Sequence, residues 1–428
     1  MQTTTVKNRQ ILAAVIGNAL EWYDFVVYGF LTVIISRLFF PSDSEYSSLL
    51  LAMATFGVGF FMRPVGGILI GMYADRKGRK SALQLIILLM TIAMAMIAFA
   101  PTQAAVGAAA PIAIVLARLL QGMATGGEFA SATAFLVESA PAGRRGFYGS
   151  LQMVGQSIAA LAGASAGMLI TQGLSPEQLD SWGWRLPFMF GLLIGPVGLW
   201  IRRHLDETEA FMQATAAEHA KPDQLVGFKA LWREHKRDVL VCFGLVLSST
   251  IMYYVVLIYM PTYAKTQLNI PLKDAFMAQV AGLLCLTAGT PVFGMLSDRI
   301  GRRPVMLLAS VLYFLLPYPL FSWLQAEPVL LRLAIMQVIL CSAIAIGFGA
   351  ISTVLAEQFP VRMRSTGLAL AYNFAVMLFG GFAQLIVTWL IGVTGTPLAP
   401  AYYVMFGAVA GFAAAWFITE RYRQEILH

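Results

Sequence analysis

Ionisable side chains inside long apolar stretches are the residues of this sequence best placed to do chemistry. Five of them stand out, all in the first half of the chain: Glu21, Asp24, Arg63, Arg118 and Glu128. Because a charge costs roughly 2.5–3.5 kcal/mol at the centre of a bilayer, such residues indicate a function. Two carboxylates one helical turn apart repel each other, and burial disfavours their charge, which favours reversible protonation. A guanidinium stays charged and matches a carboxylate with two hydrogen bonds.

Asp24 is the expected proton-coupling residue, with Glu21 and Glu128 as alternates. Histidine is the usual proton carrier near neutral pH, but all four histidines lie in polar segments outside the apolar runs: His204, His219, His235 and His428. Arg118 is the expected anchor for an anionic group, and its alternative role is to tune the proton acceptor. For Arg63 and Glu128, a structural ion pair within one half is the favoured interpretation.

Polar side chains on the same helical faces are expected to line a cavity. At 100° per residue, one face of the first apolar segment carries the two carboxylates together with Asn18 and Tyr28. Gln121 shares a face with Arg118. Further candidates lie in later segments: Gln152, Gln156, Tyr253, Tyr254 and Asn373. Amide and phenol donors suit carboxylate and hydroxyl oxygens, and packing or an interhelical hydrogen bond is the alternative for each.

The elements that must position these residues are membrane-spanning helices. The chain has 428 residues, of which 58% are hydrophobic and 12% charged, whereas soluble proteins carry about 25% charged residues. The apolar runs are long and do not alternate, so helices are expected rather than a barrel. Twelve spans are expected, near residues 11–36, 48–74, 81–100, 106–138, 146–172, 185–202, 238–263, 275–297, 304–324, 329–357, 365–391 and 400–420.

The net charge of +7 is explained by topology rather than by nucleic-acid binding. With both termini cytoplasmic, the inner segments hold 22 of the 29 Lys and Arg residues, as the positive-inside rule predicts. We therefore expect a multi-pass protein of the plasma (inner) membrane. The three cysteines form no CxxC pair, so neither a metal site nor a disulfide framework is expected. No phosphate-binding loop of the GxxxxGK[ST] type occurs, and neither a cofactor nor ATP is expected.

A duplication organises the chain. Residues 71–80 recur as residues 294–303 with six of ten positions identical, at an offset of 223 residues. A second motif, in which arginines follow a Glu and a Pro, begins at Glu138 and recurs at Glu357. The polar stretch 203–236 is expected to be a cytoplasmic linker between two six-helix bundles, 1–202 and 237–428. Such repeats place a substrate site between the halves, near mid-membrane.

Several motifs resemble those of the major facilitator superfamily. They are the two repeated loops (DRKGRK at 75–80 and DRIGRR at 298–303) and RLLQG at 118–122. The segments GNALEWYDF at 17–25, RPVGG at 63–67 and WGWRLPF at 182–188 are more specifically similar to the metabolite–proton symporter family. Within that family, overall similarity is greatest to the citrate and tricarballylate carriers. The resemblance implies an all-α fold of two pseudo-symmetric six-helix bundles.

The resemblance also implies a gate on the inner face, formed by the repeated loops. Asp75 would face the start of the eleventh span, Arg79 would reach Glu138, and Arg302 would reach Glu357. These contacts would exist only when the inner face is closed. The expected gate residues are Asp75, Arg76, Arg79, Glu138, Asp298, Arg302 and Glu357.

The expected function is secondary transport, in which an organic anion, citrate or a related di- or tricarboxylate, enters together with protons. Proton-coupled transport of a zwitterion such as proline or betaine, and sodium-coupled carboxylate transport, are alternatives within the class. Aromatic residues such as Trp22, Tyr253 and Tyr254 could hold a quaternary ammonium group. A membrane sensor is the alternative outside the class, but the short linker offers no output domain. Paired gate loops argue against a channel.

Overall fold

The computed structural model describes residues 2–77, 79–126, 128–141, 143–193, 195–196 and 224–421, and every regular element in these ranges is a helix. The first half contains α1 (Gln2–Phe30), α2 (Thr32–Phe39), α3 (Glu45–Lys77), α4 (Arg79–Ala98), α5 (Gln103–Val106), α6 (Ala109–Ala124), α7 (Glu128–Glu138), α8 (Arg145–Gly173), α9 (Pro176–Gln178), the π-helix η1 (Leu179–Gly183) and α10 (Arg185–Leu192).

The second half repeats this all-helical pattern. It contains α13 (Gln224–Tyr253), the π-helix η2 (Tyr254–Ile258), α14 (Met260–Leu268), α15 (Leu272–Ile300), α16 (Arg302–Leu315), α17 (Pro317–Ala326), α18 (Leu330–Glu357), α19 (Val361–Ala375), the π-helix η3 (Val376–Gly381), α20 (Ala383–Thr394) and α21 (Ala399–Trp416). The start of α13 takes up residues 224–236 of the expected linker, and its backbone is kinked at His235. The rest of the expected linker, 203–223, lies outside the described residues.

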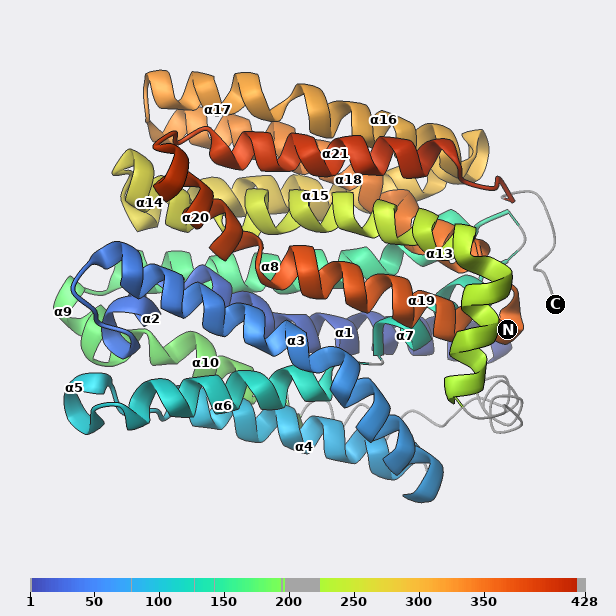
Figure 1. Cartoon of the computed structure of the whole chain (residues 1–428), viewed down its shortest axis with the longest axis horizontal. Helices are drawn as coiled ribbons and strands as arrows, with labels where there is room; N and C mark the ends of the chain where they lie inside the picture. The colour runs from blue at the N-terminus through green and yellow to red at the C-terminus, as the bar shows by residue number, and fades with distance from the viewer. Residues whose placement is uncertain are drawn as a thin grey trace.

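The long helices run side by side along the longest axis of the molecule, and the start of α1 and the end of α21 lie at the same end of it (Figure 1). Most helices of the first half lie in the lower part of the view and most helices of the second half in the upper part, while α19 and the start of α13 reach into the lower part. The halves meet where α8 packs along α15 and where α3 packs on η3 and α20. The interface between the halves therefore runs through the middle of the molecule.

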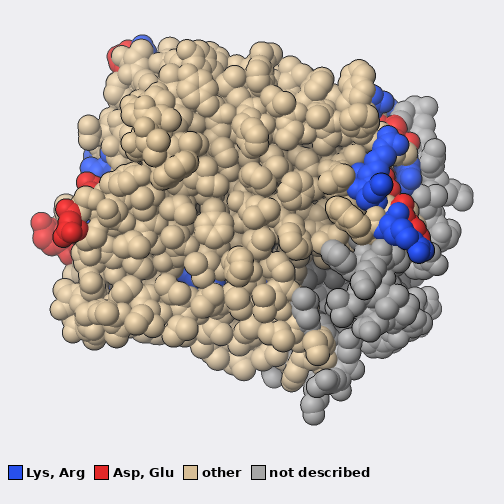
Figure 2. All heavy atoms as spheres, viewed as in Figure 1, with Lys and Arg blue, Asp and Glu red and all other residues tan. Residues whose placement is uncertain are grey.

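The surface has the polarity of a membrane protein. Lys, Arg, Asp and Glu side chains gather at the two ends of the molecule, and the broad band between them is almost entirely uncharged (Figure 2). Within the described ranges, eight helices are long and apolar enough to cross a membrane, or nine if the bent pair α1–α2 is one span. The remaining expected spans consist of shorter helices, because breaks divide them or because they extend beyond the described residues.

Several of the expected uninterrupted spans are in fact broken, each for a local reason. The span expected at 11–36 bends by 64° between α1 and α2, where the Thr32 hydroxyl donates to the Gly29 carbonyl at 2.8 Å. The span expected at 304–324 is present as one apolar span, Arg302–Ala326, although the helix is interrupted before Pro317, which has no backbone N–H to continue the ladder. Between α6 and α7, α3 comes so close that a Cβ on Gly126 would lie 2.1 Å from the Arg63 carbonyl oxygen.

Candidate functional site

Arg118 is completely buried among aromatic rings. Its guanidinium carbon lies 4.7–4.9 Å from the ring centroids of Phe25, Tyr28 and Phe56. One terminal nitrogen donates to Gln121 Oε1 at 2.7 Å, and the other donates to the Phe56 carbonyl at 3.4 Å. These contacts replace part of the water that the charge has lost. They also hold the guanidinium in one place, deep in the first half.

Asp24 lies beside this arginine. The residue is 1% exposed, and its Oδ1 has no hydrogen-bond partner within the described part of the chain. The next residue of α1, Phe25, contacts the Arg118 guanidinium. Glu21 lies one turn earlier on α1 and is also buried. A buried carboxyl next to a fixed guanidinium is an arrangement suited to proton exchange.

Arg63 occupies a second aromatic cage, next to the first. Its guanidinium carbon lies 5.0 Å from the Trp22 ring, 4.7 Å from the Phe25 ring and 4.6 Å from the Phe60 ring. Phe25 therefore contacts both buried guanidinium groups. Arg63 Nε has no hydrogen-bond partner among the residues that the structure describes. The side chain of Glu128, the expected ion-pair partner, lies outside the described residues.

A small cavity lies between the two halves, close to Arg63. Its volume is about 30 Å³, which is room for about one or two water molecules. The first half lines it with Trp22, Phe129, Met153 and Gln156, and the second half with Val246, Ser249, Thr250, Tyr253, Tyr254, Phe348, Ile351, Leu355, Tyr372 and Val376. A tricarboxylate does not fit, so the cavity must widen to admit one.

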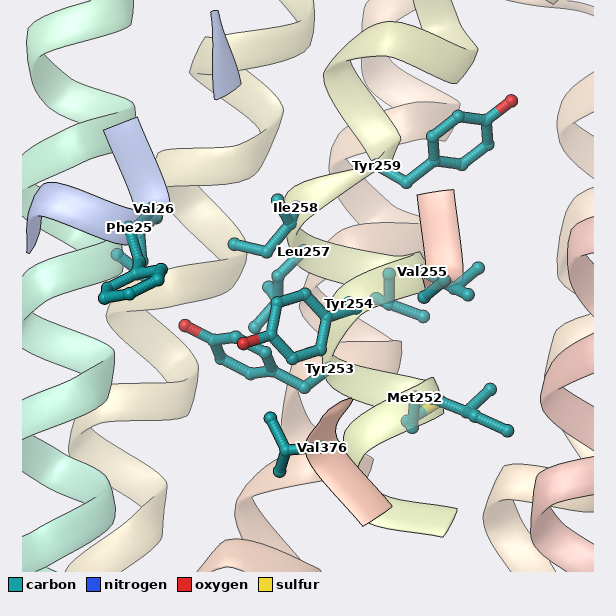
Figure 3. Packing of buried hydrophobic residues seen from close by; sticks show 14 of the residues in the cluster. Phe25, Val26, Met252, Tyr253, Tyr254, Val255, Leu257, Ile258, Tyr259 and Val376 are labelled. Carbon is teal, nitrogen blue, oxygen red and sulfur yellow. The ribbon is translucent and has the colours of Figure 1, made fainter. Parts of the chain in front are cut away.

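The polar atoms at this cavity are mostly donors without partners. Ser249 Oγ, Gln156 Nε2 and the hydroxyls of Tyr253 and Tyr254 have no hydrogen-bond partner within the described ranges. Figure 3 shows both tyrosine hydroxyls pointing towards the side of α1 that carries Phe25, whereas Tyr259 points away. Since buried donors normally find partners, this cluster is suited to an oxygen-rich ligand.

Two π-helices place these groups. Tyr254 begins η2 and Val376 begins η3, and both residues line the cavity. A π-helical turn inserts an extra residue into a helix and is frequent at functional sites. The extra residue changes the direction in which the following side chains point. An apolar pattern of constant period therefore could not predict η2 or η3.

Three of the nine expected substrate contacts line the cavity, namely Gln156, Tyr253 and Tyr254. Asn18 and Gln152 instead bind each other across α1 and α8: Asn18 Nδ2 donates to the Gln152 carbonyl at 2.9 Å, and Gln152 Nε2 donates to Asn18 Oδ1 at 3.1 Å. In this conformation Asn18 and Gln152 therefore form an interhelical hydrogen bond, which was the alternative to lining a cavity.

The other four expected contacts are also engaged elsewhere in this conformation. The Tyr28 hydroxyl donates to the Ala52 carbonyl at 3.1 Å, and Gln121 accepts from Arg118 as described above. Asn373 Nδ2 donates to the Gly126 carbonyl at 2.8 Å, which joins α19 of the second half to the break between α6 and α7. These residues support the site from behind rather than form its wall.

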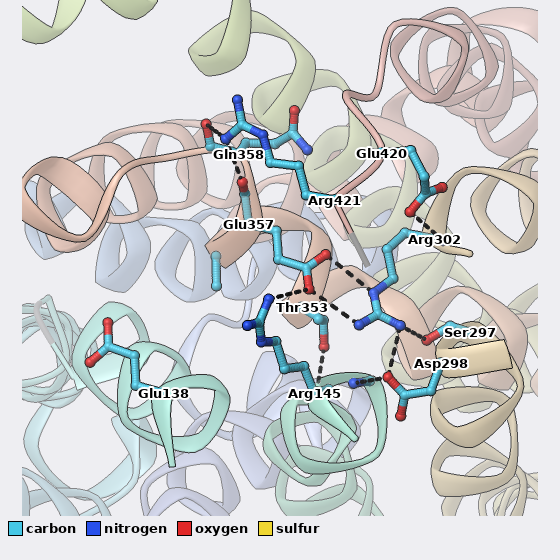
Figure 4. A network of polar contacts seen from close by, with 12 residues as sticks. Glu138, Arg145, Ser297, Asp298, Arg302, Thr353, Glu357, Gln358, Glu420 and Arg421 are labelled. Carbon is cyan, nitrogen blue, oxygen red and sulfur yellow. Dashed lines mark hydrogen bonds and ion pairs between the residues drawn. The ribbon is translucent and has the colours of Figure 1, made fainter. Parts of the chain in front are cut away.

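The repeated loop of the second half forms a charged network with the start of α8 and the end of α18 (Figure 4), at the end of the molecule where α1 begins (Figure 1). Arg302 donates to both oxygens of Glu357 at 3.2 Å, which is the contact that the resemblance implied. Asp298 accepts from Arg302 Nη1 at 2.9 Å. It also accepts from the backbone N–H groups of Gly146 and Phe147 at 2.7 and 3.0 Å, so it caps the start of α8 in the other half.

Two further ion pairs cross between the halves. Arg145 at the start of α8 lies 3.9 Å from Glu357 at the end of α18. Arg364 on α19 binds Glu138 at the end of α7 at 2.5 Å. The two pairs occupy equivalent positions in the duplicated motif, with the partners exchanged. We call the six residues of this network the latch layer: Glu138, Arg145, Asp298, Arg302, Glu357 and Arg364.

The expected contact between Arg79 and Glu138 cannot be compared with the structure, because the side chains of Asp75, Arg76 and Arg79 lie outside the described residues. Arg364 was not among the expected gate residues. The duplicated motif could have identified it, because Arg364 follows Glu357 at the same spacing at which Arg145 follows Glu138. Phe129, Ser249 and Tyr372 were also missed, because nothing in their local sequence distinguishes them from packing residues.

Comparisons with known proteins agree over nearly the whole chain. Residues 14–289 match the family model described as Major Facilitator Superfamily, and residues 212–426 match the one described as Sugar (and other) transporter. A citrate-proton symporter of Salmonella typhi is 36% identical over 94% of this chain and 92% of its own length. A proline/betaine transporter of Escherichia coli (strain K12) is 34% identical over 94% of this chain and 81% of its own.

Solved structures are similar in fold. The xylose transporter XylE from E. coli, in a partially occluded inward open conformation, superposes with a TM-score of 0.78 over 97% of this chain and 98% of that one. Its sequence identity of 18% supports the shared architecture and carries no information on the solute.

Proposed function

The chain belongs to the major facilitator superfamily and has its twelve-helix fold, and we propose that it imports citrate or a related di- or tricarboxylate together with protons. Its relatives are membrane transporters, and a proton-coupled symporter of a small solute is the function they share with it. The choice of a carboxylate is our inference from the site.

The observation that carries this choice is the balance of charge and donors around the cavity. The first half buries the Arg63 guanidinium against Trp22, which lines the cavity. The partnerless polar atoms at the wall can all donate a hydrogen bond, and no Asp or Glu lines the cavity within the described ranges. The rings that could hold a quaternary ammonium are already in use. Arg63 covers Trp22, and Tyr253 stacks on Phe348 at 5.6 Å. An anion with several oxygens matches this lining better than a zwitterion does.

Proton coupling is assigned to Asp24, with Glu21 and Glu128 as alternates. Protonation of Asp24 would remove the negative charge next to Arg118 and so leave a net positive field for the incoming anion. Release of the proton would restore the negative charge of Asp24 and disfavour the bound anion. Substrate and proton would thus move together because the ionised Asp24 competes with the anion for the positive field of the arginines, and protonation removes this competitor.

The transport cycle requires the halves to move relative to each other, since the cavity is too small for the substrate in this conformation. We place the latch layer on the cytoplasmic side, because the positive-inside bias puts both termini there. The structure then corresponds to a state closed to the cytoplasm. Breaking the ion pairs between the halves would open the cavity inwards.

A zwitterion carrier is the second candidate, because the proline/betaine transporters are nearly as similar in sequence as the citrate-proton symporters.

Uptake of labelled citrate into proteoliposomes with an imposed pH gradient distinguishes a carboxylate carrier from a zwitterion carrier. We expect accumulation that collapses with the gradient, competition by tricarballylate, and no competition by proline or betaine. Accumulation driven by a sodium gradient alone would identify sodium, rather than the proton, as the coupling ion. Strong competition by betaine would replace the carboxylate with a zwitterion.

A further inference from the structure

We propose that Gln384 sets how readily the cavity opens at the end of the molecule opposite the latch layer. In this conformation the Gln384 amide is buried without partners at a contact between the two halves, and opening that contact returns the amide to water. This inference does not depend on which solute is carried, because it concerns the entrance to the cavity and not the cargo.

Gln384 lies on a span that passes the latch layer, the cavity and the opposite end in turn. The span comprises most of α19 together with η3 and α20, and it follows Arg364 of the latch layer directly. Val376, which lines the cavity, comes 12 residues after Arg364, and Gln384 comes eight residues after Val376. At about 1.5 Å per helical residue, Gln384 lies about 12 Å beyond the cavity. Figure 1 shows α20 leading away from the end where α1 begins.

The two halves make close contact at this level, where α3 packs on η3 and α20. The Phe382 ring lies on Gly57 of α3, since a Cβ on this glycine would lie 2.5 Å from the ring. In return, Phe60 of α3 lies on Gly381, where a Cβ would lie 2.6 Å from the Phe60 side chain. We call these four residues and Gln384 the outer seam. Rings seated on glycines in both directions leave no room for a solute, so the outer seam is closed in this conformation.

The outer seam adjoins the cavity at Tyr254. The rings of Phe60 and Tyr254 meet edge to face, with centroids 5.6 Å apart, and Tyr254 lines the cavity. Gly380, the residue before the seam, contacts the same tyrosine, because a Cβ on it would lie 2.8 Å from the Tyr254 ring. Separation of α3 from η3 at this point therefore uncovers the cavity wall at Tyr254.

Gln384 is the polar member of the outer seam. Its side chain is completely buried, and neither Nε2 nor Oε1 has a hydrogen-bond partner within the described residues. Nε2 faces the first half, since a Cβ on Gly29 of α1 would lie 3.2 Å from it. Thr388, one turn further along α20, donates instead to the Tyr259 hydroxyl at 3.1 Å. A buried amide without partners loses the hydrogen bonds that it makes in water, so closing the seam has a cost that opening removes.

The first experiment needs no solute. Ser249, which lines the cavity, is replaced by a reporter cysteine in a background without the native cysteines, and labelling by an impermeant thiol reagent is measured from outside intact cells. Gln384→Met keeps the length of the side chain and removes both polar atoms, so we expect labelling to slow about tenfold. Gln384→Glu should speed it, because a buried charge is less favourable than a buried amide. A general loss of packing would not produce opposite shifts at one site.

Tyr403→Phe is the matched control for Gln384→Met. It also removes a buried polar atom that has no partner within the described residues, but on α21, which packs mainly on helices of its own half. Labelling should therefore stay at the parent rate. Equal rates for the parent and both Gln384 variants would overturn the proposal, even if citrate uptake is confirmed. The same opposite shifts seen from the cytoplasmic side in inverted vesicles would support the role of Gln384 and reverse the orientation.

The second experiment tests the seam itself with the same reporter. Gly57→Ala should push Phe382 away and speed labelling from outside several-fold, and Phe382→Ala should do so by removing the ring. Gly244→Ala is the matched control, since its Cβ would lie 2.8 Å from Ala414 Cβ inside the second half and should leave labelling unchanged. Each variant is checked for folding by size-exclusion chromatography. If neither folded seam variant labels faster than the control, the outer seam is not the entrance.

Discussion

Replacing Asp298 with Asn should open the latch end of the protein without harming the solute site. Asp298 accepts two backbone hydrogen bonds from the start of α8, at 2.7 and 3.0 Å, and these bonds join the two halves. Asparagine loses the charge and turns an NH2 group towards one of these donors. The side chain is not part of the cavity wall, so the change should act on the conformational equilibrium alone.

The magnitude follows from those two contacts. A hydrogen bond to a charged group contributes about 1.5–3 kcal/mol, and asparagine can keep one neutral bond while losing the other. We therefore expect the closed state to lose about 1.5–3 kcal/mol, which shifts its equilibrium with the inward-open state by about ten- to hundredfold. The pair between Arg302 and Glu357 should remain.

A thiol assay measures this shift. Ser150 is completely buried and lies against Gly294, at the face between α8 and α15. In a Ser150→Cys reporter without native cysteines, purified protein carrying Asp298→Asn should react with a maleimide much faster than the parent. Asp274→Asn is the matched control, because it neutralises an acid in the first turn of the same helix. Unchanged labelling, or loss of citrate binding by a folded Asp298→Asn protein, would refute this interpretation.

Three further results are expected. Asp24→Asn should abolish accumulation driven by a pH gradient and spare solute exchange, because the amide mimics only the protonated carboxyl; retained accumulation would move the coupling role to Glu21 and then Glu128. Gly122→Ala should lower the melting temperature through an overpacking cost of about 1–3 kcal/mol, since its Cβ would lie 1.7 Å from the Gly59 carbonyl oxygen, whereas Gly173→Ala, which meets nothing within 4 Å, should not. A cysteine at Asp223 in the cysteine-free background should resist impermeant reagents outside intact cells, and rapid labelling would reverse the orientation.

Features that depend on composition and repeated spacing could be predicted from the amino-acid sequence. Apolar runs too long for the core of a soluble protein indicated membrane-spanning helices, because a helix satisfies the backbone hydrogen bonds of such a run inside a bilayer. The resemblance of the duplicated loops to those of a known family implied the contact between Arg302 and Glu357, which the structure contains. The buried charges were also identifiable, because a charge in an apolar run is costly in any arrangement.

Only the tertiary structure decided which way each polar group faces. Gln152 and Gln156 lie one turn apart on α8, yet Gln152 binds Asn18 while Gln156 lines the cavity. Helical periodicity cannot separate such neighbours, because it says which residues share a face but not which helix covers that face. The same holds for Phe129 and Tyr372, which are remote in sequence and stack only because the two halves pack together. Contacts between halves depend on the relative position of two rigid bundles, which no local pattern encodes.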